Sequence, residues 1–385
     1  MMIDLSAAFD MVHHRVLLQK LELFGLDSHS LAWISSYLSN RSQVVMVDGC
    51  FSPPLSITCG VPQGSILGPL LYILFTNDIP DLVHHHPVDY LSPAPHCLDC
   101  SSTVCYVDDS TYSHGDSDPV ALSNTLSSQY SKISNYMASN KLVINGDKTH
   151  LLVLGTKKTA AKRHEVEVNA DGHIILPSRS EKLLGGIVSE DMKWKEHLLN
   201  SNHSLVSQLT SRLNGLLKVA SRASISTRLM IANGIFMSKL VYLIQLWGNS
   251  DKYLLKAIQI LQNKAARSVT GKTYWTPVRR LLKDCKWLSV KQLVFYHTAL
   301  QTHKILMSGS PAYFRLNMNT AHPYRTRQAT GGSIWRGEED LTGMSFRSRG
   351  AQAYNSLPVD IRSCRIMNTF KYKLRKWVAS NIPID

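Results

Sequence analysis

The stretch Tyr106-Val107-Asp108-Asp109 places two carboxylates side by side between two β-prone segments. Residues 101–105 precede it and residues 110–114 follow it, and both segments are rich in small, β-branched or aromatic residues. The pattern predicts a β-hairpin with the aspartates at its turn. Adjacent carboxylates repel one another, so a fold keeps them together mainly to hold a cation. An ordinary acidic turn is the alternative, because aspartate is common in turns.

A third carboxylate, Asp4, ends a short apolar segment at the start of the chain that is typical of a strand. If this strand neighbours the hairpin in one sheet, Asp4, Asp108 and Asp109 converge on one point. Such a cluster suits a two-metal phosphoryl-transfer site, in which one ion activates a hydroxyl and the other neutralises a triphosphate. Mg²⁺ prefers hard oxygen ligands, and Mn²⁺ also fits them. The sequence therefore predicts a site for two Mg²⁺ ions.

The charge is distributed unevenly along the 385 residues. Residues 1–190 carry 12 Lys and Arg against 19 Asp and Glu, whereas residues 191–385 carry 30 against 9. An acidic first half joined to a basic second half favours a metal-binding part followed by a part that binds a polyanion. The alternative is a basic surface with no specific partner.

The sequence also bears on membrane association and on the redox state of the cysteines. No run of about 18 apolar residues occurs, and no signal-peptide pattern is expected at the N-terminus, so no membrane partner is predicted. The seven cysteines are odd in number and scattered, which favours free thiols in a reducing compartment. Cys97 and Cys100, with His84–His86 and His96 nearby, would suit zinc, but a single such pair is weak support and a variable loop is the default interpretation.

Hydrophobic periodicity predicts an α+β fold. Helices are expected over residues 7–24, 28–38, 66–83 and 120–140, and strands over residues 41–48, 55–59 and 149–154. Strand pairs are expected within residues 165–191, with turns at residues 170–172 and 184–186. Long helical periods then run to about Ser308, before a less regular stretch that is rich in Gly, Ser, Pro and Arg. These changes predict three domains, residues 1–192, 193–308 and 309–385.

Three segments together resemble a known family. Residues 4–10 (DLSAAFD), 60–69 (GVPQGSILGP) and 106–109 (YVDD) resemble motifs A, B and C of reverse transcriptases, most of all those of non-LTR (LINE-type) retrotransposons. Any one motif could arise by chance, but three in this order and spacing form a specific signal. The resemblance continues in segments similar to motif D, the primer grip and the downstream region, at residues 142–149, 183–197, 246–248, 262–267 and 353–358. It implies a polymerase palm, with an antiparallel sheet backed by helices, followed by a helical basic thumb and a basic C-terminal region.

Catalytic roles follow from the resemblance residue by residue. It implies that Asp4, Asp108 and Asp109 bind the two metal ions, and that Asp10 supports the site. Lys148 matches the motif D lysine, a candidate general acid for the pyrophosphate leaving group. A solvated surface lysine is the alternative for Lys148.

Nucleotide-binding roles are implied in the same way. Phe9 would be the steric gate beneath the nucleotide sugar, and a helix core residue is the alternative. The remaining residues expected to bind the templating base and the incoming nucleotide are Gly60, Pro62, Gln63, Gly64 and Tyr106.

The basic second half is implied to bind a template–primer duplex. Lys264 and Arg267 lie three residues apart, so they share a helical face that could follow phosphates. A solvated amphipathic face is the alternative. Tryptophans in this half are expected in the core or at interdomain contacts rather than as base-stacking platforms, namely Trp194, Trp247, Trp275 and Trp287.

The resemblance predicts an RNA-directed DNA polymerase acting with an RNA template, a DNA primer and dNTPs. It implies an intracellular location, in the nucleus and in a cytoplasmic complex with the element RNA. Because the sequence starts at motif A, the fingers and endonuclease regions of the family are expected to be missing, and a truncated copy with weak or no activity alone is predicted. The main alternative is a non-catalytic nucleic-acid-binding remnant. An RNA-dependent RNA polymerase fits less well, because bulky Phe9 would exclude a 2′-hydroxyl.

Overall fold

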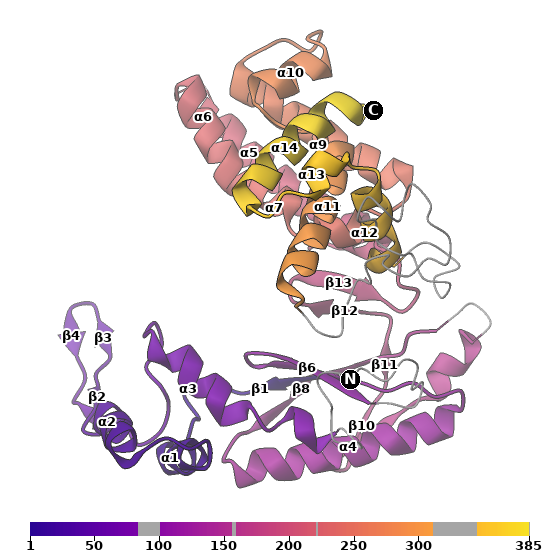
Figure 1. Ribbon diagram of the computed structural model, residues 1–385. Helices are drawn as coiled ribbons and strands as arrows, with labels where there is room; N and C mark the ends of the chain where they lie inside the picture. Colours follow the sequence, from indigo (N-terminus) through magenta and orange to yellow (C-terminus); the bar gives the residue numbers. More distant parts are fainter. Residues whose placement is uncertain (84–100, 156–158, 221, 311–344, 385) are drawn as a thin grey trace. The chain divides into compact units, whose positions relative to one another are not determined.

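Figure 1 shows the computed structural model of the chain, which describes residues 1–83, 101–155, 159–220, 222–310 and 345–384. The chain divides into two compact units. The first contains residues 1–184 and 189–192, and the second contains residues 185–188 and 193–385. Cys97, Cys100 and the histidines considered as zinc ligands lie outside the described residues.

A five-stranded sheet forms the centre of the first unit, in the order β11-β8-β1-β7-β6. Strand β1 (Met2–Leu5) runs antiparallel to both of its neighbours, β7 (Asp109–Ser113) and β8 (Ile144–Leu152). The outer strands are β6 (Ser102–Tyr106) and β11 (Pro177–Ser178). The first strand and the hairpin are therefore neighbours in one sheet, as the sequence required for the carboxylates to meet.

Side chains alternate across β1, because successive residues of a strand point to opposite faces. Ile3 and Leu5 are buried in the core, whereas Asp4 lies on the other face. The core side of the sheet packs against apolar residues of α3 (Leu67–Thr76) and α4 (Pro119–Ser139). Helix α4 runs alongside the sheet, as Figure 1 shows. The mixed α+β class expected from the sequence is confirmed.

The other elements of the first unit lie before α3 and after β8, apart from η1, which follows α3. Two helices and four two-residue strands come first: α1 (His14–Leu23), α2 (Ser28–Leu38), β2 (Ser42–Gln43), β3 (Met46–Val47), β4 (Cys50–Phe51) and β5 (Leu55–Ser56). The short helices and later strands are η1 (Pro80–Leu82), η2 (Ala161–Glu165), β9 (Val168–Ala170), β10 (His173–Ile175) and β12 (Ser180–Leu183). The turns expected at residues 170–172 and 184–186 are confirmed, with positive φ at Asp171, Gly172, Leu184 and Gly185.

The first helix is shorter than predicted. It begins at His14 rather than residue 7, and residues 6–12 form turns in which Ala7 has a φ of 47°. Two backbone hydrogen bonds join this segment to the loop at residue 60, from Val61 N–H to the Phe9 carbonyl and from Gly60 N–H to the Val12 carbonyl. These contacts are remote in sequence, so helical periodicity could not predict them.

The strands expected over residues 41–48 and 55–59 are likewise reduced to two-residue pairs with exposed side chains.

The second unit is mainly helical in its described residues. Its elements are β13 (Gly186–Ser189), the π-helical segments η3 (Glu196–Asn200) and η4 (Ala232–Met237), α5 (Leu205–Ala220), α6 (Ile225–Ile231), α7 (Ser238–Val241), α8 (Ile244–Trp247), α9 (Lys252–Thr270), α10 (Val278–Asp284), α11 (Val290–Ser308), α12 (Phe346–Asn355), α13 (Val359–Arg362) and α14 (Met367–Asn381). One hydrophobic core joins α5, α9, α11 and α14. Among the described helices, none is both long and apolar enough to span a membrane.

Candidate active site

The two aspartates of the hairpin lie where its strands turn. Tyr106 pairs with Asp109 across the hairpin, so Val107 and Asp108 form a two-residue loop. Val107 has a φ of 58°, a conformation that such loops usually assign to glycine or asparagine. Asp109 is the first residue of β7, the strand that pairs with β1. The chain therefore brings Asp108 and Asp109 to the end of β1 that carries Asp4.

A small pocket in the first unit is lined by two of these three aspartates. Its volume is about 210 Å³, and Asp4 and Asp109 both line it, together with Lys148. The Asp4 Oδ2 atom is buried and accepts no hydrogen bond from the described residues, although the Lys148 Nζ atom lies 3.2 Å away. Glu181 and Lys182 line the pocket as well, so three carboxylates and two ammonium groups share one cavity.

The pKa of Asp109 is influenced by the two neighbouring carboxylates and by Lys148. Burial raises the pKa of Asp109, and the nearby charges of Asp108 and Asp4 raise it further, whereas Lys148 lowers it. Each neighbouring carboxylate therefore disfavours the charged form of Asp109. A bound cation would reverse this effect, because it stabilises all three charges together.

The metal prediction can be compared with this arrangement. Within the described residues, no three His, Cys, Asp or Glu side chains stand close enough together to hold a metal ion. Asp4 and Asp109 line the pocket, whereas Asp108 does not line it but lies close enough to raise the pKa of Asp109. The donor atoms still fit Mg²⁺, because they are carboxylate oxygens and one of them is buried without a hydrogen-bond donor. Two-metal binding stays a prediction.

A bulge in β8 directs Lys148 toward Asp4. Opposite β1, Met2 pairs with His150 and Asp4 pairs with Asn145, so β1 advances two residues while β8 advances five. Bulges of this kind change the direction of a side chain and are common beside active sites. The sequence predicted a strand only from residue 149, so it missed both the longer strand and the bulge.

The residues expected to bind nucleotide surround a glycine-containing loop. Gly60 has a φ of 91°, and a Cβ atom there would lie 2.9 Å from the Asp10 carbonyl oxygen. The exposed Gln63 donates a hydrogen bond of 2.9 Å from Nε2 to Asp10 Oδ1. Pro62 accepts a 2.7 Å hydrogen bond from the Ser65 hydroxyl, and Gly64 has a φ of 79°. The loop is therefore tied to the turn that follows β1.

Phe9 lies in that turn and not in a helix. Its ring stacks on Tyr72 of α3 with centroids 4.8 Å apart, and the side chain is half-buried against the core. Tyr72 itself is fully buried, and its hydroxyl has no partner among the described residues. Burial raises the pKa of Tyr72, and the charge of Asp108 raises it further. The sequence did not indicate a role for Tyr72, because it lies in a continuous apolar helix and no local signal distinguishes it from its neighbours.

Two further residues complete the surroundings of the loop and the hairpin. His14 Nε2 lies 2.7 Å from the Gly60 carbonyl oxygen, a contact that no sequence signal predicted. Tyr106 is exposed at the end of β6. The structure thus brings Asp4, Asp109 and Lys148 into one pocket, while the loop residues and Phe9 lie along the adjoining turn.

The comparison with known proteins agrees with this geometry. Residues 1–187 match the family described as "Reverse transcriptase (RNA-dependent DNA polymerase)". We call the segment that matches this family the reverse transcriptase domain. The matched segment includes β1, the glycine-containing loop and the aspartate hairpin.

Relatives extend the similarity beyond the reverse transcriptase domain. The chain is 27% identical over 306 residues to the RNA-directed DNA polymerase from mobile element jockey of Drosophila funebris, an alignment that covers 78% of this chain and 32% of the relative. It is 26% identical over 304 residues to the probable RNA-directed DNA polymerase from transposon BS of Drosophila melanogaster, covering 79% and 32%. The chain thus spans about a third of the length of these two relatives.

The two basic residues expected to contact a duplex lie on α9, in the second unit. Lys264 is exposed. Arg267 is half-buried, donates a 3.1 Å hydrogen bond from Nη2 to the Tyr274 carbonyl, and lies over the Tyr274 ring. Lys264 and Arg267 therefore share a helical face, as predicted. The Arg267 guanidinium group, however, already binds the loop that follows α9.

The tryptophans of the second unit differ in burial. Trp247 and Trp287 are buried, and Trp194 is half-buried against the same core. Trp275 is 87% exposed, so it does not lie in the core, and its alternative position at an interdomain contact stays a prediction. The residue follows the end of α9 in a loop, where the periodicity of the helices gives no information about burial.

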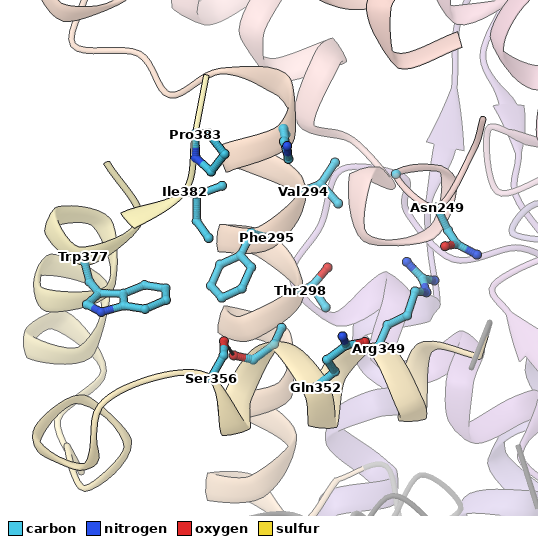
Figure 2. A pocket seen from close by; sticks show the side chains of 13 residues that line it. Asn249, Val294, Phe295, Thr298, Arg349, Gln352, Ser356, Trp377, Ile382 and Pro383 are labelled. Atoms are coloured by element: carbon cyan, nitrogen blue, oxygen red, sulfur yellow. Dashed lines mark hydrogen bonds between the residues drawn. The ribbon is translucent and has the colours of Figure 1, made fainter. Parts of the chain in front are cut away.

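A cavity of about 530 Å³ lies in the second unit (Figure 2). Phe295 of α11 and Trp377 of α14 form part of its wall, with ring centroids 5.5 Å apart. Arg349 at its edge donates a 3.2 Å hydrogen bond to the Gln245 carbonyl. Among the described residues that line this cavity, none is Asp or Glu. Its chemistry does not suit metal ions, so the smaller acidic pocket of the reverse transcriptase domain is the candidate active site.

Proposed function

We propose that this chain is the RNA-directed DNA polymerase core of a non-LTR retrotransposon and adds dNTPs to the 3′-hydroxyl of a primer. The observation that carries the proposal is the gathering of Asp4 and Asp109 in one pocket, with Asp108 close enough to raise the pKa of Asp109. Bound Mg²⁺, or Mn²⁺, would lower the pKa of the primer hydroxyl and neutralise the triphosphate. Asp4, Asp108 and Asp109 would hold the two ions.

Lys148 is the proposed proton donor to the pyrophosphate leaving group. Its ammonium group lies in the same pocket as Asp4 and Asp109, 3.2 Å from Asp4 Oδ2. An ammonium group at this position can also stabilise the negative charge that develops on the leaving oxygen. Both roles require Lys148 to move from Asp4 toward the substrate.

The turn and loop beside the pocket are the proposed nucleotide site. Phe9 stacks on the Tyr72 ring, and this contact fixes the position of the Phe9 side chain. In this position Phe9 would exclude a sugar that carries a 2′-hydroxyl. Gln63 donates a hydrogen bond to Asp10, and this contact would orient the loop toward the base pair. Gly60, Pro62, Gly64 and Tyr106 are assigned to the same nucleotide site.

The basic second unit is the proposed binding surface for an RNA template paired with a DNA primer. Lys264 and other exposed cations would neutralise phosphates, and binding would weaken as salt rises. This chemistry is consistent with an intracellular complex with element RNA that acts in the nucleus. We propose weak polymerase activity for the chain alone, because the residues lining the pocket supply few cations for a triphosphate.

A non-catalytic nucleic-acid-binding protein is the second candidate. The observation that favours it is that Lys148 already neutralises Asp4, while no three-ligand group is assembled in the described residues. In this case the aspartates would have no ion to hold, and the second unit alone would account for the function.

Primer extension and metal binding distinguish the two candidates. The purified chain is incubated with an RNA template, a DNA primer, dNTPs and Mg²⁺ or Mn²⁺, and Mn²⁺ binding is followed separately by electron paramagnetic resonance. The Asp108→Asn/Asp109→Asn double variant is expected to lose any extension and to bind Mn²⁺ at least tenfold more weakly, because two anionic ligands become neutral. Template–primer binding should persist or strengthen.

The control is Asp81→Asn, an exposed carboxylate on η1 that does not line the pocket. It should leave extension and Mn²⁺ binding unchanged. Extension that survives the double substitution would reject the catalytic assignment of the hairpin. Nucleic-acid binding with neither extension nor Mn²⁺ binding in the unaltered chain would favour the second candidate.

A further inference from the structure

Two adjacent aromatic side chains are exposed on the loop between α9 and α10. Tyr274 is 77% exposed and Trp275 is 87% exposed. Their rings meet edge to face, with centroids 5.7 Å apart and an interplanar angle of 83°. Aromatic side chains of this size normally bury most of their surface. We call these two residues the Tyr274–Trp275 platform.

The platform is held in place by the helix before it. Arg267 of α9 donates a 3.1 Å hydrogen bond to the Tyr274 carbonyl and lies over the Tyr274 ring, 5.2 Å from its centroid. The Thr276 N–H donates to the Thr273 carbonyl at 3.1 Å, which closes a turn around both rings. A loop fixed in this way loses little conformational entropy when a ligand stacks on it.

The surroundings of the platform are cationic. Residues 271–286 contain five Lys and Arg but one acidic residue, Asp284. Asp284 forms an ion pair with Lys272, which lowers the pKa of its carboxyl group. Arg279 and Arg280 follow the platform on α10 and are exposed. A ligand that contacts the rings would therefore find two exposed arginines at the start of the helix that follows them.

We propose that the Tyr274–Trp275 platform stacks against unpaired bases of single-stranded nucleic acid, while Arg279 and Arg280 contact the adjoining phosphates. Exposed ring faces beside cations match a strand that offers base faces and phosphates in alternation. A continuous duplex hides the faces of its bases, so it would gain only the phosphate contacts. The proposal goes beyond the polymerase reaction, because it depends on the second unit and needs neither the aspartates nor dNTPs.

The test compares normal and abasic single strands. Binding of the full chain to a fluorescent 12-nucleotide oligo(U), and to an abasic strand of the same length, is measured by anisotropy without dNTPs or divalent ions. Trp275→Ala should weaken oligo(U) binding about 5- to 100-fold, the range expected for the loss of one stacked base. It should change abasic-strand binding less than twofold, and Trp275→Phe should retain most of the oligo(U) affinity.

The matched control is Trp33→Ala, an exposed tryptophan on α2 in the first unit. It should leave oligo(U) binding unchanged. Equal losses on both strands, or no loss on oligo(U), would overturn the proposal. Unchanged oligo(U) affinity with a lower melting temperature, or with weaker binding to anionic vesicles, would overturn it in favour of a protein or membrane contact.

Discussion

Val107 has a positive φ of 58°, although β-branched residues rarely adopt such values. The strain of about 1–2 kcal/mol is confined to the two-residue loop between Tyr106 and Asp109. The short loop sets Asp108 and Asp109 at the tip of the hairpin, next to Asp4. A less strained sequence would serve an ordinary turn equally well, so the strain supports a functional assignment of this loop.

Gly60 provides a test at the residue scale. A Cβ atom at this position would lie 2.9 Å from the Asp10 carbonyl oxygen, and its φ of 91° is unfavourable for alanine. Gly60→Ala is therefore expected to lower the free energy of unfolding by about 2–3 kcal/mol, measured by urea denaturation. Gly64→Ala is the control, because its φ is 79° but no atom lies within 4 Å of the new Cβ. Equal destabilisation by both variants would show that φ strain alone matters.

At the scale of elements, three helices of the reverse transcriptase domain meet at one partly buried lysine. Lys20 of α1 donates hydrogen bonds to the Phe75 carbonyl at 2.7 Å, to Asp78 at 2.9 Å and to the Tyr136 hydroxyl at 2.7 Å. Burial lowers the pKa of Lys20, while Asp78 opposes this effect. The contact joins α1 to the end of α3 and to α4, the helices that support Phe9 and the sheet.

Lys20→Met is expected to destabilise the chain by about 2–3 kcal/mol in urea denaturation at pH 7. The substitution preserves most of the apolar stem, but it leaves the Phe75 carbonyl without the Lys20 donor and leaves Asp78 with only the hydrogen bond from the Tyr136 hydroxyl. The expected loss is below that of a fully buried pair, because the Asp78 side chain is 44% exposed. Lys132→Met on the exposed face of α4 should change stability by less than 0.5 kcal/mol. An equally small effect of Lys20→Met would mean that water replaces its contacts.

At the scale of the whole molecule, the two units have separate hydrophobic cores and different charge. The core of the first unit surrounds the sheet, and that of the second joins its helices. Residues 1–190 are acidic overall, whereas residues 191–385 are basic. The proposed metal site and the proposed polyanion-binding surface therefore belong to different units, and each proposal can be tested by its own variants.

The second unit is expected to lose stability in mild acid. Burial lowers the pKa of His197 and of His297 to about 4, from an ordinary value of about 6.5. His197 is held neutral, since its Nδ1 accepts a 3.3 Å hydrogen bond from the Ile187 N–H. Between pH 6.5 and 4 the unfolded state binds more protons than the folded state. Stability is therefore complete above pH 6.5 and falls as the pH decreases, by about 2 kcal/mol per histidine at pH 5.

Urea denaturation followed by tryptophan fluorescence at pH 7 and pH 5 measures this loss, because Trp247 and Trp287 are buried in the second unit. The His197→Gln/His297→Gln variant should lose markedly less stability between the two pH values than the unaltered chain. His203→Gln, at an exposed site, should behave like the unaltered chain. The same pH dependence in all three proteins would assign the acid sensitivity to other groups.

Sequence patterns predicted the elements whose signals are local. The helix expected over residues 120–140 is α4, Pro119–Ser139, because its apolar spacing and the cap from Asp118 lie within a single segment. The hairpin around Asp108 and Asp109 was predicted for the same reason. The start of α1 was wrong, because residues 6–12 are shaped by hydrogen bonds to the loop at residue 60.

The sequence by itself determined the α+β class, the hairpin that carries two aspartates, and the motifs of a reverse transcriptase domain. Only the tertiary structure decided that β1 lies between β7 and β8, that a bulge directs Lys148 to Asp4, and that Arg267 holds an exposed Trp275 loop. The physical reason is that periodicity records which face of an element is apolar, whereas strand partners, bulges and loop contacts depend on segments far apart in the chain.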